Sequence, residues 1–170
     1  MKRSMKRLVL SFLPTAAHRR LRMRKQASKS HDHRDPTFIE VTPDITFETY
    51  WKDVEAGKGP ALIVWCRFRK IMKFDCFGKG RGHYHISVPV YSSGADEADR
   101  IYLPEESVEA QVERVAFELK GNLPYFLARA AYRGARKVTV PTPDLLHAVD
   151  EARSLMYEHA ETCAERGRLP

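Results

Sequence analysis

The stretch from Ile71 to Tyr91, IMKFDCF-GKGRG-HYHISVPVY, contains two runs with alternating apolar residues and a short segment between them. That segment holds Gly78, Gly80 and Gly82. Glycine tolerates positive φ, so the chain can reverse direction there at little cost. The stretch predicts a β-hairpin, and we expect this hairpin to be central in an antiparallel sheet.

The pairing of the two strands sorts the hairpin into an apolar face and a polar face, because side chains alternate along a strand. We expect Phe77 to pair with His83, which places Asp75 opposite His85. The apolar face comprises Met72, Phe74, Cys76, Tyr84, Ile86, Val88 and Val90. The polar face comprises Lys73, Asp75, His83, His85 and Ser87, with Lys73 opposite Ser87. We expect the polar face to point outward, toward solvent or a partner.

The polar face holds the candidate site of this chain. His83 and His85 are two residues apart on one strand, and Asp75 is close by on the other. Two imidazoles and a carboxylate can bind a divalent metal ion, or Asp75 can orient His85 for acid–base chemistry near neutral pH. The alternative is a half-exposed strand face that happens to contain two histidines.

The segment Gly80–Ile86, GRGHYHI, resembles the histidine–hydrophobe–histidine strand of rolling-circle replication initiators and related single-strand nickases. The residues that this resemblance implies are the metal ligands His83, His85 and Asp75 and a nucleophile, Tyr125 or Tyr132. The chain departs from that pattern in two places. It has no threonine-rich strand before the hairpin, and Arg129 follows Tyr125 where a lysine is frequent.

A second resemblance extends over roughly residues 70 to 150. The segments FDCF (74–77), HYH (83–85) and LPYFL (123–127) are similar to those of a small family of uncharacterised bacterial proteins. The function of that family is unknown, so the resemblance implies no activity.

The basic residues are concentrated at the N terminus. The chain has 170 residues, 43% of them apolar, and a formal net charge of +7. Residues 1–30 contain ten Lys or Arg and no acid, whereas the rest of the chain has 19 basic and 22 acidic residues. We therefore expect residues 1–36 to be a disordered basic tail, of which residues 1–30 bind nucleic acid or anionic surfaces non-specifically.

The cysteines favour a reducing compartment. Cys66, Cys76 and Cys163 are far apart and form no CxxC pair, which predicts small core residues rather than a disulfide framework. We expect a cytoplasmic protein, although the acid-free N terminus also resembles an organellar transit peptide. No apolar run reaches the roughly 20 residues of a membrane span.

Residues 37–167 predict a single α+β domain, in which three C-terminal helices cover one face of the antiparallel sheet. Thr42-Pro43-Asp44 suits a helix start, and Phe47, Tyr50, Trp51 and Val54 follow at helical spacing. The expected strands are 37–41, 61–68, 71–77, 83–91, 100–103 (at the sheet edge) and 136–140. The expected helices are 43–57, 107–120, 123–133 and 143–166.

The sequence predicts a non-enzymatic domain that binds a protein or small ligand through the polar outer face of its sheet. It has no Walker-type loop, no GxGxxG and no serine nucleophile elbow, so no complete catalytic set is visible. The alternative is a metal-dependent phosphodiesterase or single-strand nickase, with His83, His85 and Asp75 as ligands and Tyr125 or Tyr132 as nucleophile.

Overall fold

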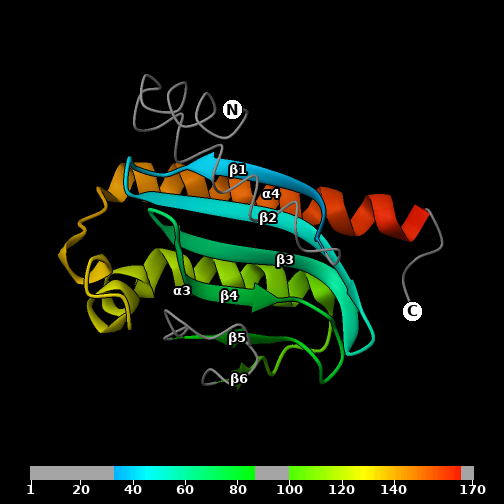
Figure 1. Ribbon diagram of the computed structural model, residues 1–170. Helices are drawn as coiled ribbons and strands as arrows, with labels where there is room; N and C mark the ends of the chain where they lie inside the picture. Colours follow the sequence, from blue (N-terminus) through cyan, green and yellow to red (C-terminus); the bar gives the residue numbers. More distant parts are fainter. Residues whose placement is uncertain (1–32, 87–99, 166–170) are drawn as a thin grey trace, which may run out of the picture. The chain divides into compact units, whose positions relative to one another are not determined.

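A computed structural model divides the chain into two units, Met1–His31 and Asp32–Pro170. It describes residues 33–86 and 100–165. The described residues form an α+β fold, as predicted, with a six-stranded sheet and two long helices (Figure 1).

The sheet is an antiparallel meander in which each strand pairs with the next along the chain. Its strands are β1 (His33–Glu40), β2 (Ile45–Val54), β3 (Gly57–Cys66), β4 (Arg69–Asp75), β5 (His83–His85) and β6 (Arg100–Tyr102). The prediction that residues 61–68 form a central strand is confirmed by β3, which lies between β2 and β4. The prediction of an edge strand at residues 100–103 is confirmed by β6.

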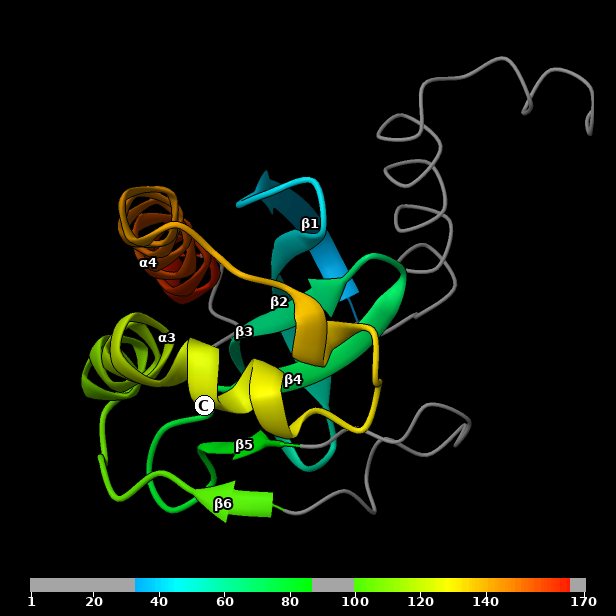
Figure 2. The same ribbon diagram turned by 90° about the vertical axis from the view of Figure 1, so that its left-hand side faces the viewer.

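Helices α3 (Val108–Arg129) and α4 (Thr142–Glu165) cover one face of the sheet, and a short 3₁₀ helix, η2 (Ala135–Lys137), lies between them in sequence (Figure 2). The core lies between these helices and the sheet. Its strand residues include Phe47, Val64, Met72 and Phe74, and its helix residues include Leu119, Leu123, Val149 and Met156. No helix in residues 33–86 and 100–165 is long and apolar enough to cross a membrane.

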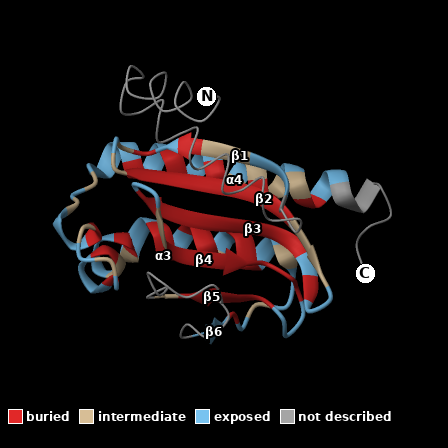
Figure 3. Cartoon of the chain, viewed as in Figure 1, coloured by how far each residue is buried: buried red, intermediate tan, exposed pale blue. Residues whose placement is uncertain are grey.

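Strands β2, β3 and β4 are buried on both faces (Figure 3). On the face away from the helices, Ile63 and Trp65 are 0% and 1% exposed, and Trp65 Nε1 donates a 2.7 Å hydrogen bond to Glu48 Oε2. The expectation that this face looks outward to solvent is therefore wrong for the central strands.

The predicted helix at residues 43–57 is also wrong, because these residues form β2. The sequence ITFETYWKDV is rich in β-branched and aromatic residues, which favour a pleated, half-buried surface. Thr42 does not cap a helix. Its Oγ1 accepts hydrogen bonds from the amides of Asp44 and Ile45, at 3.3 and 3.1 Å, within the turn that joins β1 to β2.

The predicted helices 107–120 and 123–133 are one continuous helix, α3. Leu119, Leu123 and Leu127 follow at a spacing of four and are all buried, so one apolar stripe runs through the expected break. Pro124 lies within the helix on its exposed side. The predicted strand 136–140 is not formed, since η2 occupies its start. The third predicted helix, 143–166, corresponds to α4, and the side chain of Cys163 lies outside the described residues.

The hairpin forms with a register two residues away from the expected one. Asp75 pairs with His83, Phe74 with Tyr84, and Lys73 with His85. Because the shift is even, every side chain keeps its predicted face. The expected partners Ser87, Val88 and Val90 lie outside the described residues. Gly78 and Gly80 have φ of +73° and +65°, the left-handed conformation expected of glycines in the turn.

Candidate metal centre

The structure brings Asp75, His83 and His85 together. Asp75 ends β4 and lies opposite His83, while His85 follows two residues along β5 on the same face. Each residue offers one ligand atom, and the three atoms lie within 4.8 Å of one another. In the part of the chain that the structure describes, this is the one group of three such residues placed to hold a metal ion.

The three side chains are buried, which corrects the expectation of an exposed polar face. Asp75 and His85 are 0% exposed and His83 is 6% exposed. The His83 ring lies 4.9 Å from the His85 ring, 5.9 Å from Phe77 and 6.1 Å from Tyr102, measured between centroids. The cluster is thus an interior polar site beside aromatic rings.

The hydrogen bonds of the cluster leave several ligand atoms open. The His83 Nδ1 lies 2.8 Å from the carbonyl oxygen of Arg81, to which it can only donate. This assigns the proton to Nδ1 and leaves the Nε2 lone pair, 3.4 Å from Asp75 Oδ2, for a ligand. Among the described residues, neither ring nitrogen of His85 has a hydrogen-bond partner, and neither does Asp75 Oδ1.

Burial favours the neutral form of both histidines. Burial lowers the pKa of His83 below its usual range, although the Arg81 carbonyl and Asp75 partly offset this effect. Burial, together with the charge of Lys73, lowers the pKa of His85 to about 4. Neutral imidazole is the form that binds metal ions.

Two lysines complete the cluster. Lys52 Nζ lies 3.0 Å and Lys73 Nζ 3.1 Å from the same oxygen, Asp75 Oδ2. Burial alone would raise the pKa of Asp75, but the two ammonium groups outweigh it and lower that pKa. Burial lowers the pKa of Lys52 to about 8, against the opposing attraction of Asp75.

Small residues on β3 let Lys52 reach Asp75 across an intervening strand. Gly59 lies opposite Lys52, and Ala61 lies opposite Asp75. A Cβ atom at Gly59 would collide with the carbonyl oxygen of Cys76. The absence of a side chain at this position therefore allows β3 and the segment after β4 to approach each other closely.

Gln111 on α3 anchors the turn that leads from Asp75 to His83. Its side chain accepts from the Gly78 amide at 3.0 Å and donates to the carbonyls of Gly78 and Glu105, at 3.0 and 2.7 Å. Gln111 is fully buried. It fixes the β4–β5 turn to the helical layer, and so positions the two strands that present the ligands.

The structure does not bring the predicted tyrosine nucleophiles to this site. Tyr125 lies on α3 with its ring 5.9 Å from Phe126, and Phe126 contacts Tyr84 on the helix-covered face of the sheet. Tyr132 also packs against the helix-side core. Asp75, His83 and His85 point from the opposite face, so the sheet separates them from both tyrosines.

Sequence reasoning missed Lys52 and Gln111. The predicted helix 43–57 includes Lys52, whereas the alternation in ITFETYWKDV places Glu48, Tyr50 and Lys52 on one face of a strand. Gln111 has no sequence signal of its own, because its role depends on the contact between α3 and the turn.

No protein-family model, curated protein or solved structure matches this chain. Both family resemblances in the sequence therefore stay predictions.

Proposed function

We propose that this protein is a metal-dependent hydrolase in which Asp75, His83 and His85 hold one divalent transition-metal ion. The observation that supports this most strongly is the buried His85 imidazole, which has no hydrogen-bond partner among the described residues and lies beside two other ligands. A buried polar group without a partner costs free energy, and a bound ion would satisfy it.

The ligand set supports a catalytic ion rather than a structural one. Two imidazole nitrogens and one carboxylate oxygen suit Zn²⁺, Mn²⁺ or Fe²⁺. Structural zinc sites usually have four protein ligands, whereas catalytic sites have three and keep a position for water or substrate. A metal ion at such a site lowers the pKa of bound water and polarises a phosphoryl or carbonyl oxygen.

The proposed chemistry is hydrolysis by water and needs no covalent tyrosine, since Tyr125 and Tyr132 lie across the sheet from the ligands. An assay of phosphodiester hydrolysis on bis-p-nitrophenyl phosphate with Mn²⁺ tests it. We expect turnover that is lost in His85→Ala and kept in Tyr125→Phe and Tyr132→Phe. A covalent adduct with single-stranded DNA that requires either tyrosine would instead support the nickase mechanism.

As a second candidate we propose a partner-binding domain that uses the β6 edge, whereas the sequence predicts binding through the polar outer face of the sheet. Tyr102 is 61% and Ile101 37% exposed on this edge strand. An edge strand offers unpaired backbone groups to a partner. Wild-type protein that binds no metal ion, with a partner interaction that Tyr102→Ala removes, would favour this candidate.

A further inference from the structure

We infer that Lys52 and Lys73 form a subsite for a phosphate-type oxyanion, and that this anion binds cooperatively with the metal ion. The inference rests on the proposed metal site and names the class of its substrate. Its physical basis is an excess of positive charge in a buried cluster.

The two ammonium groups share a single carboxylate. Both contact Asp75 Oδ2, and the side chains of Lys52 and Lys73 are only 12% and 9% exposed. Lys52 and Lys73 together therefore carry one positive charge more than Asp75 neutralises. Buried charge is costly unless it is paired, and a divalent ion on the same carboxylate would add two further positive charges.

A bound oxyanion supplies the negative charge that Lys52, Lys73 and the metal ion lack. It can accept hydrogen bonds from the ammonium groups and donate an oxygen to the ion, so that all three cations share one counter-charge. Lysine supplies three donors on a compact point charge and is a frequent phosphate ligand. By linkage, an anion that strengthens ion binding is itself bound more tightly when the ion is present.

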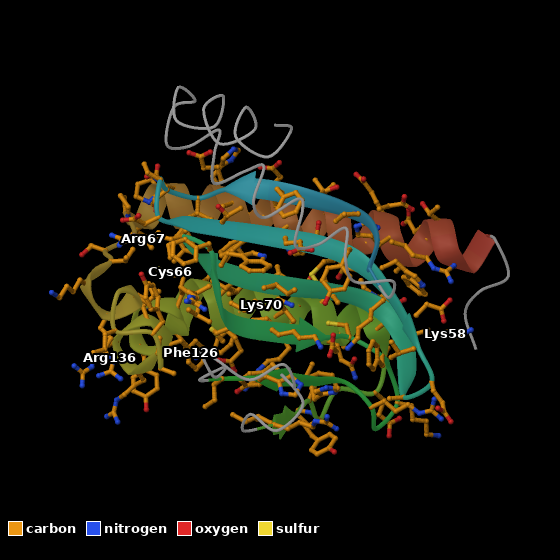
Figure 4. All side chains as sticks on the ribbon, viewed as in Figure 1. Lys58, Cys66, Arg67, Lys70, Phe126 and Arg136 are labelled. Atoms are coloured by element: carbon orange, nitrogen blue, oxygen red, sulfur yellow. The ribbon has the colours of Figure 1, made fainter. Side chains whose placement is uncertain are left out.

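A hollow with basic residues in its lining includes Phe77 and Arg81, which both contact His83. It has a volume of about 470 Å³ and is lined by Lys58, Phe77, Gly78, Lys79, Arg81, Glu106 and Val108. The Phe77 ring lies under Lys52 Nζ, 5.4 Å away, and beside His83, and the Arg81 carbonyl bonds to His83. Lys58 lies at the β2–β3 end of the sheet, opposite to the end where Arg67 lies (Figure 4). Lys58 pairs with Asp53 at 3.4 Å. Lys79 and Arg81, with Glu106 as the acid in the lining, supply the positive charge that attracts anions toward this side of the site.

The coupling between Mn²⁺ and phosphate binding is tested by calorimetric titration of the full chain with Mn²⁺. The titration is done once in inorganic phosphate and once in chloride at matched ionic strength. We expect phosphate to tighten Mn²⁺ binding about tenfold or more, the usual range for coupled sites. In Lys73→Met, Mn²⁺ should bind more tightly than in wild type when phosphate is absent, because one repelling ammonium is gone. Phosphate should then have little further effect.

We expect the same result for a second variant, Lys52→Met. Lys120→Met is the control: Lys120 lies on the exposed side of α3, so this variant should keep the wild-type coupling. If phosphate does not change the Mn²⁺ affinity of the wild-type protein, the oxyanion subsite is wrong, whereas the proposed metal site is still supported by the Mn²⁺ binding itself. Equal coupling in wild type and in both lysine variants would lead to the same conclusion. Absence of Mn²⁺ binding in every protein would overturn the proposed function and the subsite together.

Discussion

Asp75 is the residue on which the polar cluster depends, because among the described residues it is the carboxylate that pairs with both Lys52 and Lys73. It is fully buried, and both lysines contact the same one of its oxygens. Asp150 also pairs with a lysine, Lys120, but this ion pair lies at the surface and the Asp150 side chain is 57% exposed. The two carboxylates make similar contacts in different surroundings, which allows a matched comparison.

We predict that Asp75→Asn destabilises the fold by about 3 kcal/mol, since it leaves two buried ammonium groups without a counter-charge. Asp150→Asn should have little effect, because exposed ion pairs contribute little to stability. Urea unfolding followed by circular dichroism measures both variants. Similar midpoints for Asp75→Asn and wild type would show that the buried carboxylate does not hold the cluster together.

The neutral histidines predict a loss of stability in mild acid. The pKa of His85 is about 4 in the folded protein, below the 6.5 of a free histidine. From pH 6.5 down toward 4 the unfolded chain therefore binds a proton that the folded chain does not. The free energy of unfolding should fall with pH in this window, by up to about 1.4 kcal/mol per pH unit for this group.

This pH dependence is measured by urea unfolding of metal-free protein between pH 7 and pH 5. The pKa of His83 is lowered too and adds in the same direction. In His85→Asn the loss between the two pH values should be smaller than in wild type. An equal loss would mean that His85 is protonated in the folded protein.

At the scale of single residues, the sequence predicted which side chains would come together but not their surroundings. Asp75, His83 and His85 share a face because strands alternate, and the even register shift left that face unchanged. Their burial could not be predicted, because it depends on how the whole sheet is covered. The Lys52–Asp75 contact could not be predicted either, because the sequence pattern predicts a helix at Lys52.

At the scale of elements, residues typical of helix ends predict the wrong boundaries in two places. The segment Thr42–Asp44 has the composition of a helix start, yet it closes the β1–β2 turn, because β2 pairs along its length with β3. Gly121 and Asn122 predict the end of one helix and the start of the next, but α3 continues through both residues. There the buried leucines hold α3 together, and Asn122 donates a 2.6 Å hydrogen bond to Glu118.

The continuity of α3 predicts that Pro124→Ala stabilises the protein by about 1–3 kcal/mol. Pro124 cannot donate to the Lys120 carbonyl inside the helix, whereas alanine can. Pro143→Ala is the matched control, because Pro143 lies in the first turn of α4, where the amide has no partner to lose. Thermal unfolding measures both. If Pro124→Ala brought no gain, residues 121–124 would instead start a second helix.

At the scale of the whole molecule, the fold class is easier to predict than the number and order of the elements. The α+β class, the antiparallel sheet and its β6 edge followed from the glycine-rich hairpin and the spacing of apolar residues. The six-strand meander does not follow, because the sequence pattern predicts a helix at β2 and shorter strands at β1 and β3. Polyanion binding by residues 1–30 lies outside the described residues and stays a prediction.

The metal content of the protein is the most direct test of the proposed site at Asp75, His83 and His85. Metal-free full-length protein is dialysed against Zn²⁺, Mn²⁺ or Co²⁺, and the bound ion is counted by elemental analysis. We predict about one ion per chain in wild type, none in His85→Ala, and the wild-type value in His147→Ala, whose histidine is exposed on α4. Wild-type protein that retains none of the three ions, or a His85→Ala variant that binds as much as wild type, would contradict the account.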